Sequence, residues 1–295
     1  MIGDRLIVPI NNTSSTGSLA VLVTAELARL TSRDKLICEL LAVHHTLTTD
    51  QLAEVVFGSL GRARNRLAEL HRRGILDRFR HYHRPGTQSW RWTLGPVGAA
   101  IRAAAGGEAF PRPATVRAAT ARLAASPHLD HLIGTNGFFT ALHAHARAHP
   151  GTRVVRWWSE ATCRTATGGA VRPDALGVWA DGRRRVPFWL EYDTGTETVA
   201  RVAAKLSGYA QLAGSPWAAL SVLVFTSGGA RRETALHAAL ARAASGTTLN
   251  VATATADAGG PAGPVWRRIG HGDRVALADL PAAPVPADDG PDAPP

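Results

Sequence analysis

The chain has 295 residues, of which 45% are hydrophobic, and its 33 lysines and arginines against 23 aspartates and glutamates give a formal net charge of +10. No stretch approaches the roughly 18 consecutive apolar residues of a membrane span, and the N-terminus lacks the order of a secretory signal, so we expect a cytoplasmic protein without membrane contact. Cys38 and Cys163 stand far apart and outside any CxxC motif, which argues against a disulfide framework or a zinc site. The basic charge favours a polyanionic partner.

The length suggests two compact domains rather than one. Both ends contain stretches poor in large apolar residues and rich in Ser, Thr, Gly, Pro or Asp, and we expect these stretches to be disordered. The predicted organisation is a flexible N-terminus over residues 1–30, a first domain over 31–105, a linker with a helix over 106–127, a second domain over 128–255, and an irregular region with a Pro-rich tail over 256–295.

Two helices open the first domain. Apolar residues recur at helical spacing from Asp34 to His44, which predicts an amphipathic helix. Thr48 or Thr49 is then in position to cap a short second helix that reaches Phe57.

A third helix and a hairpin complete the first domain. The segment RARNRLAELHRRG predicts a helix with Leu67 and Leu70 inward and Gly74 as its end. Residues 75–95 alternate and break at Pro85 and Gly86, which predicts a β-hairpin. Three helices and a hairpin indicate a winged helix-turn-helix, whose third helix enters the major groove while the hairpin wing lies along the backbone.

Arginine is concentrated in this helix and wing. From Arg62 to Trp92 there are nine arginines against two acids, Glu69 and Asp77. This density predicts that the partner is double-stranded DNA, although an Arg-rich helix face that serves protein contacts is the alternative. The candidate DNA-binding residues are Arg62, Arg64, Arg66, Arg72, Arg73, Arg80, Arg84 and Arg91.

The second domain shows the order helix, three strands, helix, strand. Short β-rich runs separated by turn residues follow a helical stretch, and a very apolar strand bracketed by Pro216 and Ser227 closes the series. The expected fold class is therefore α/β (α+β), with an αβββαβ second domain. The predicted elements are a helix over residues 136–150, strands over 152–163, 171–180 and 184–193, a helix over 196–214 and a strand over 219–227.

Two acids meet across the predicted hairpin of the second and third strands. If Gly182 and Arg183 form its loop, Asp174 lies directly opposite Glu191; if the loop is one residue earlier, the two acids are diagonal neighbours. Alternation places Asp193 on the same face as Glu191 in either register. Opposed carboxylates repel, and Mg²⁺ or Mn²⁺ would neutralise them, since Mg²⁺ takes one or two carboxylates plus water and phosphate oxygens. Pairing with nearby arginines such as Arg172, Arg184 or Arg201 is the alternative.

Lysine usage adds a third residue to this candidate metal site. Only Lys35 and Lys205 stand among the 33 basic residues, and Lys205 lies on the helix directly after the acidic cluster. An ammonium is a compact point charge that can orient a water or contact a phosphate. Tyr209 shares its helix face. The candidate catalytic residues are Asp174, Glu191 and Lys205, with Asp174 and Glu191 as metal ligands.

The proline–aspartate pair of VRPD, followed by an acid at the end of the next strand within αβββαβ order, resembles the PD-(D/E)XK nuclease superfamily. The resemblance implies a restriction-endonuclease-like domain in which Asp174 and Glu191 bind the metal. The usual lysine, two residues beyond the second acid, is replaced here by Asp193; displacement of that lysine to the following helix occurs in the superfamily, and Lys205 matches it. Glu160 is a further acid near the site.

More specifically, the chain resembles the replication-relaxation proteins of actinobacterial plasmids and integrative elements. The matching stretches are LTTDQLAEVVF, ARNRLAELHRRGILDRFR, VVRWWSEATC, VRPDALGVW and FWLEYDTGTETVARVAAKLSGYAQLA, which extend from Leu47 to Ala213. The resemblance implies a role in plasmid replication and DNA relaxation.

Two functions follow from these patterns. The first is a DNA-binding protein of plasmid or mobile-element replication and relaxation that is also a metal-dependent DNA endonuclease, acting as a nickase. The alternative is a non-catalytic winged-helix replication or transcription factor whose nuclease-like domain is degenerate. The sequence does not give the DNA site, the oligomeric state or the partner replication proteins.

Overall fold

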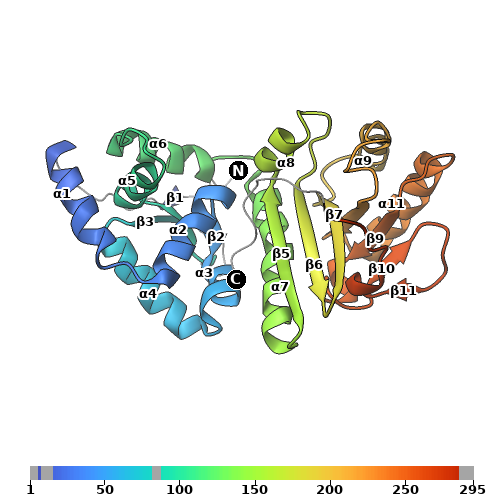
Figure 1. Ribbon diagram of the computed structural model, residues 1–295, viewed down its shortest axis with the longest axis horizontal. Coiled ribbons are helices and arrows are strands. Elements are labelled where there is room, and N and C mark those ends of the chain that lie inside the picture. Colours follow the sequence, from blue (N-terminus) through green and yellow to red (C-terminus); the bar gives the residue numbers. More distant parts are fainter. Residues whose placement is uncertain (1–5, 8–15, 82–87, 286–295) are drawn as a thin grey trace. The chain divides into compact units, whose positions relative to one another are not determined.

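The computed structural model describes residues 6–7, 16–81 and 88–285 (Figure 1). Contacts divide the chain into two compact units, Met1–Asn136 and Gly137–Pro295, and the division falls within helix α7, Leu129–Ala148. The predicted hairpin turn at Pro85 and Gly86, the candidate Arg84 and most of the segments predicted to be disordered lie outside the described residues. None of the described helices combines the length and apolar character that a bilayer crossing requires.

The first unit is mainly helical, with one small sheet. Its four strands are ordered β1-β3-β4-β2 in the sheet. Along the chain, the described helices of the unit lie between these strands and after the last of them. The elements are β1 Leu6–Ile7, α1 Thr16–Leu27, α2 Ser32–His44, β2 Leu47–Thr48, α3 Thr49–Leu52, the π-helical turn η1 Ala53–Phe57, α4 Leu60–Arg72, β3 Leu76–His81, β4 Arg91–Leu94, α5 Pro96–Ala105 and α6 Pro113–Ala124.

Local sequence signals fix the helix ends of this unit. The Thr31 side chain caps α2 in a capping box with Asp34, and Thr48, rather than Thr49, caps α3 in a second box with Gln51. Each box satisfies backbone N–H groups that the first helical turn leaves without partners. Gly74 follows α4 with a φ of 69°, a conformation that favours glycine.

The core of the first unit matches the predicted helix faces. Leu67 and Leu70 of α4 are fully buried, as predicted, and pack in a unit whose core also contains Ile37 and Trp92. The indole Nε1 of Trp92 donates to Thr49 Oγ1 at 2.9 Å, which ties β4 to the start of α3. Helix α3 contacts α4, while α2 packs against β4 and α4 against β3. The three helices are thereby joined to the β3–β4 hairpin.

The predicted linker of residues 106–127 contains a packed helix. Ala124 of α6 is buried in one cluster with Phe79 and Leu129, and its carbonyl lies 3.1 Å from His81 Nε2. Helix α6 therefore belongs to the first compact unit.

The second unit is built on a mixed sheet of seven strands in chain order, β5 to β11. Strands β5, β6 and β7 are antiparallel, β8 and β9 continue the sheet in parallel, and β10 and β11 are antiparallel again. The elements after α7 are β5 Thr152–Ser159, α8 Glu160–Ala166, β6 Ala175–Asp181, β7 Arg184–Asp193, α9 Val199–Ala204, α10 Leu206–Ala210, β8 Ser221–Thr226, α11 Gly229–Ala244, β9 Val251–Thr255, the 3₁₀ turn η2 Ala256–Ala258, β10 Trp266–Arg268, β11 Arg274–Val275 and the 3₁₀ turn η3 Leu277–Asp279.

Helices cover both faces of this sheet. On one face Phe138 of α7 packs edge-on against Phe188 and Phe225, and Phe139 stacks on Trp157. On the other face, side chains of α9, α10 and α11 share one buried cluster with the strands; its members include Leu176, Trp189, Val202, Leu206, Val224 and Leu240. The sheet is buried on both sides, which explains why β6, β7 and β8 read as nearly continuous apolar runs.

Three predicted elements of this unit were wrong in extent. The strand predicted over residues 152–163 ends at Ser159, because the Ser159 hydroxyl caps α8 by accepting from Thr162 N. The helix predicted over 196–214 is two short helices that meet at Lys205. The predicted irregular region 256–295 contributes β10 and β11 to the sheet, and Trp266 there is fully buried.

Candidate functional site

The β6–β7 hairpin adopts the first of the two predicted registers. Asp181 pairs with Arg184 and Ala175 with Leu190, so Gly182 and Arg183 form the loop. Asp174, one residue before β6, therefore lies opposite Glu191, and its backbone N–H donates to the Leu190 carbonyl at 3.0 Å. The Asp174 side chain also accepts a 2.7 Å bond from Tyr192 N.

Glu191 is held by the lysine and the tyrosine that the sequence singled out. It is only 4% exposed, and its Oε2 accepts from Lys205 Nζ at 2.7 Å while its Oε1 accepts from the Tyr209 hydroxyl at 2.5 Å. Lys205 stands where α9 meets α10, and its Nζ also lies 3.4 Å from Glu197 Oε2. The other lysine, Lys35, is exposed on α2, so the two lysines of the chain occupy very different environments.

The charges around Glu191 oppose and support its ionisation at the same time. Burial and, next, repulsion by Asp174 raise the pKa of Glu191 to about 7, against the lowering effect of Lys205 and Tyr209. Burial alone would lower the pKa of Lys205, but attraction to Glu191 outweighs it and the pKa lies above its usual value. Burial and the neighbouring Glu191 likewise raise the pKa of Tyr209. The site therefore contains two neighbouring carboxylates, Asp174 and Glu191, and the Lys205 ammonium bound to Glu191.

Asp193, on the same strand face, is neutralised differently. Its carboxylate accepts two bonds from Arg232 of α11, at 2.9 and 2.8 Å, and one from the Thr226 hydroxyl at 2.7 Å. Burial would raise the pKa of Asp193, but the bonds from Arg232 and Thr226 bring it below its usual value. The predicted alternative of arginine pairing thus applies to Asp193, with Arg232 as its partner, and to Glu197, which pairs with Arg201, one of the three arginines expected.

A pocket of about 340 Å³ opens beside Glu191. Its lining includes Arg172, Glu191, Lys205 and Tyr209. In the described part of the chain, no three His, Cys, Asp or Glu side chains converge as a metal cage would require. Asp174 and Glu191 nevertheless match the donor set of Mg²⁺ or Mn²⁺, which takes one or two carboxylates and completes its coordination with water and phosphate oxygens. Glu160 is exposed in the first turn of α8 and does not line this pocket.

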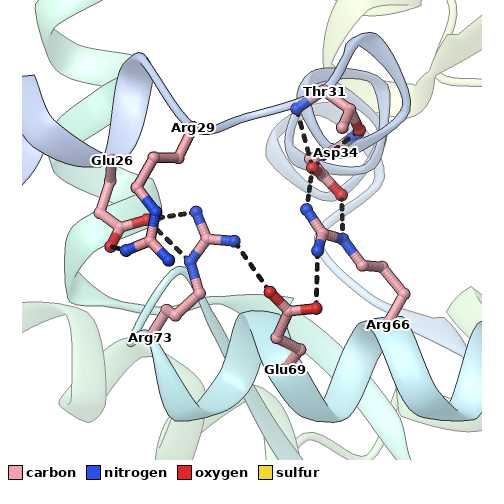
Figure 2. Close-up of polar contacts among 7 residues, drawn as sticks. All are labelled: Glu26, Arg29, Thr31, Asp34, Arg66, Glu69 and Arg73. Carbon is pink, nitrogen blue, oxygen red and sulfur yellow. Dashed lines mark hydrogen bonds and ion pairs between the residues drawn. The ribbon is translucent and has the colours of Figure 1, made fainter.

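In the first unit, two of the predicted DNA-binding arginines are bound by carboxylates (Figure 2). Arg66 donates from Nε to Asp34 Oδ1 at 2.8 Å, from Nη2 to Asp34 Oδ2 at 2.5 Å and from Nη1 to Glu69 Oε2 at 2.6 Å. These bonds outweigh the burial of Asp34 and lower its pKa. Arg66 thereby fastens α4 to the start of α2.

Arg73 extends the same network to α1. Its Nε donates to Glu26 Oε2 at 2.8 Å, its Nη2 forms a second contact with that oxygen, and its Nη1 lies 3.3 Å from Glu69 Oε1. Figure 2 shows Glu69 between the two guanidiniums, and Arg29 also contacts Glu26. Asp34 is 32 residues from Arg66 and Glu26 is 47 residues from Arg73, so no local signal could have found these two pairs. Glu69 lies three and four residues from the two arginines, a spacing at which charges on a helix pair.

The remaining candidate arginines differ in exposure. Arg62, Arg64 and Arg72 are exposed on α4, whereas Arg91 is 5% exposed with its Nη2 3.6 Å from Asp130. Burial lowers the pKa of Arg91. Arg80 lies on β3 with its guanidinium 4.1 Å from the centre of the Trp90 ring, and Arg78 lies at the same distance from that ring. Sequence reasoning missed Trp90, which brings the two arginines together.

Comparison with known proteins gives one family match. The replication-relaxation family model matches residues 39–221, a span that contains α4, the β3–β4 hairpin, Asp174, Glu191 and Lys205. No curated protein and no solved structure matches the chain. The family suggests a role in plasmid replication or relaxation and implies interaction with nucleic acid. A match over this much of the chain shows that the protein belongs to the replication-relaxation family.

Proposed function

We propose that the protein binds double-stranded DNA in plasmid or mobile-element replication or relaxation, through a winged helix-turn-helix made of α2 to β4. The observation that carries the proposal is the position of α4. This helix follows α2 and the α3–η1 segment, precedes the β3–β4 hairpin, buries Leu67 and Leu70, and exposes Arg62, Arg64 and Arg72. In such a fold the third helix enters the major groove and the hairpin contacts the backbone.

The carboxylate network assigns different tasks to the arginines of α4. Arg66 and Arg73 are bound to Asp34, Glu69 and Glu26, so they stabilise the position of the helix. The exposed arginines have no carboxylate partner among the described residues. They are therefore available to phosphate oxygens and to guanine edges in the groove.

A salt titration tests this proposal. We expect the full chain to bind a random-sequence duplex with an affinity that falls as salt rises, because each phosphate contact releases counterions and adds about 0.9 to the slope of log K against log salt. Arg62→Gln with Arg72→Gln should weaken binding and flatten this slope by about 1 to 2. Arg122→Gln, an exposed arginine of α6, is the matched control. Equal slopes for the wild type, the control and the α4 variant would contradict the proposal.

A second function, metal-dependent cleavage of DNA, is favoured by one specific observation. Lys205 Nζ lies 2.7 Å from Glu191. Asp174 lies opposite Glu191 across the hairpin. The arrangement of β5, β6 and β7 followed by helices and the parallel β8 is the order expected of a PD-(D/E)XK-like domain. We infer that the chain is a Mg²⁺-dependent or Mn²⁺-dependent endonuclease that nicks DNA.

In this function Asp174 and Glu191 would hold the metal ion. The ion supplies a water of lowered pKa and neutralises charge on the phosphate. Both Glu191 oxygens already accept one hydrogen bond, but a carboxylate offers about four lone-pair sites, so each oxygen keeps capacity for a further ligand. Lys205 favours the ionised form of Glu191, and it lines the pocket in which a phosphate would approach.

Cleavage is tested on supercoiled plasmid with Mg²⁺, with Mn²⁺ and with EDTA. We expect nicked circles with either metal, none in EDTA, and none from Asp174→Ala. Nicking that survives in Asp174→Ala would place the reaction elsewhere or in a contaminant. Complete inactivity of a wild type that binds DNA would favour the alternative, a non-catalytic replication or transcription factor with a degenerate nuclease-like domain.

A further inference from the structure

A second pocket, of about 420 Å³, lies in the first unit between α4 and the hairpin strands. Arg64 of α4, Arg78 and Arg80 of β3, and the rings of Trp90 and Trp92 line it, together with Gln88. No carboxylate is among the described residues that line it. The pocket is therefore strongly cationic and bounded by flat aromatic surfaces.

The walls of this pocket are fixed by the fold. Arg78 and Arg80 are two residues apart on β3 and so project to the same side of the strand. On the other strand, Trp92 Nε1 donates to Thr49 Oγ1 at 2.9 Å, and the Trp90 carbonyl accepts from Thr49 N at 3.0 Å. The first bond holds the Trp92 indole against the start of α3, and the second fixes the backbone at Trp90.

Trp90 brings two like charges together. The guanidiniums of Arg78 and Arg80 each lie 4.1 Å from the centre of its ring, and Arg78 lies 5.4 Å from that of Trp92. Contact with an aromatic face stabilises a guanidinium, which partly offsets the repulsion. Burial and, next, the charge of Arg80 lower the pKa of Arg78.

Hydrogen-bonding capacity also remains in the pocket. The Nε of Arg78 is buried and has no hydrogen-bond partner among the described residues. A buried donor without a partner costs free energy. The described residues that line the pocket supply three guanidiniums and no carboxylate, so one anion with several acceptor oxygens would accept from this donor and also pair with the guanidiniums.

We propose that this pocket binds a phosphate group of the nucleic acid, with Arg64, Arg78 and Arg80 as its ligands and Trp90 as the residue that positions them. The planar guanidinium fork matches phosphate oxygens in a bidentate manner. A pocket of about 420 Å³ exceeds the size of one phosphate, and so also accepts the sugar attached to it. The inference rests on the proposed DNA-binding function for the source of the phosphate, which is either the internal backbone or a strand end.

The chemistry of the pocket is tested first without DNA. Arginine Nε–Hε signals of the ¹⁵N-labelled full chain are followed by NMR while inorganic phosphate is added at constant ionic strength, with chloride as the control. The signals absent from Arg78→Gln and from Arg80→Gln identify the two arginines. We expect these two signals to shift saturably with phosphate and not with chloride. Signals that do not move with phosphate at concentrations up to tens of millimolar would overturn the proposal.

The source of the phosphate is tested with two duplexes of one sequence, one with 5′-phosphate and one with 5′-hydroxyl ends. For an internal phosphate, Arg78→Gln should weaken binding of both duplexes equally, by about tenfold for a hydrogen-bonded charge. For a terminal phosphate, the wild type should prefer the phosphorylated duplex and Arg78→Gln should lose that preference. Arg122→Gln again controls for the loss of one exposed charge.

Failure of this inference is distinguishable from failure of the proposed function. If Arg62→Gln with Arg72→Gln weakens binding of both duplexes but Arg78→Gln leaves both unchanged, the DNA-binding function stands and the pocket is not a nucleic-acid phosphate site. If the wild type binds neither duplex, the proposed function fails, and with it the assignment of the phosphate to nucleic acid.

Discussion

Glu191 and Asp193 stand two residues apart on one face of β7, yet the protein neutralises them in opposite ways. Asp193 accepts two bonds from Arg232 and one from Thr226, and its pKa is lowered although its burial acts against ionisation. Glu191 has one ammonium and one hydroxyl against a second carboxylate, and its pKa is raised to about 7. Asp193 thus has a bidentate guanidinium partner, whereas Glu191 has a single ammonium and a carboxylate neighbour.

This difference indicates where a cation would act. A bidentate guanidinium matches both oxygens of a carboxylate and leaves little negative charge to attract another ion. Glu191 has only the Lys205 ammonium, which it shares with Glu197, and Asp174 repels it; Glu197 has Arg201 as a further partner. A divalent ion is therefore expected to bind at Asp174 and Glu191 and not at Asp193.

Removal of the Asp193 charge should have the largest effect on stability. Asp193→Asn leaves Arg232 without its carboxylate, and breaking a buried ion pair costs about 3 kcal/mol or more. We expect a free energy of unfolding lower by this amount in urea titrations, with and without Mg²⁺. Asp257→Asn, an exposed acid of η2, should stay within about 0.5 kcal/mol of the wild type. A loss that appears only in Mg²⁺ would mean that Asp193 belongs to the metal site.

Removal of the Glu191 charge should behave differently. At pH 8 in EDTA, Glu191→Gln relieves the repulsion from Asp174, so we expect it to be at least as stable as the wild type. Mg²⁺ at 100 times its dissociation constant should then stabilise the wild type by about 2.7 kcal/mol and the variant by much less. Thermal melts of both proteins with EDTA and with Mg²⁺ make the comparison. A variant that melts lower in EDTA, with no Mg²⁺ response in the wild type, would make Glu191 a second structural ion pair.

The sequence predicted the Glu191 half of this comparison better than the Asp193 half. Loop chemistry at Gly182 and alternation along two strands suffice to bring Asp174 opposite Glu191, because both are short-range signals. Lys205 was accessible through its rarity in an arginine-rich chain. Arg232 is 39 residues from Asp193, and the parallel pairing of β7 with β8 and the position of α11 that bring it there have no local signature.

The same limit applies to the first unit. The helices and hairpin follow from caps and periodicity, so Thr48 and Gly74 identify two of the helix ends. The tasks of individual arginines do not follow, since a helix pattern does not distinguish an exposed Arg62 from an Arg66 bound to Asp34. Short elements such as β10 and β11, of three and two residues, carry too few positions to show a period.

The dependence of stability on pH should also distinguish Glu191 from Asp193, with a smaller expected change in free energy. A carboxyl whose pKa is raised on folding loses stabilising free energy as pH rises through its folded value, because the folded state holds a proton that the unfolded state has released. Between pH 5.5 and 8 in EDTA, the wild type should therefore lose about 1 kcal/mol or more relative to Glu191→Gln. Asp193, whose pKa is lowered, contributes no change in this interval. Melts at half-unit steps of pH measure the difference, and a constant gap between the two proteins would contradict a raised pKa.

The smallest expected effect concerns the hydroxyl of Tyr209. Its bond to Glu191 Oε1 favours the ionised carboxylate, while the ring packs against Trp189 with centroids 6.2 Å apart. Tyr209→Phe keeps the ring and removes only the hydrogen bond, so we expect a stability loss of about 1 kcal/mol. The Tyr209 hydroxyl lowers the pKa of Glu191, so that pKa should rise in Tyr209→Phe. The pH interval over which Tyr209→Phe loses stability relative to the double variant Tyr209→Phe, Glu191→Gln should therefore lie higher than the interval over which the wild type loses stability relative to Glu191→Gln. A double-mutant cycle of Tyr209→Phe and Glu191→Gln measures the coupling. An unchanged pH interval together with zero coupling would show that Tyr209 supports the core through its ring alone and has no part in setting the charge of Glu191.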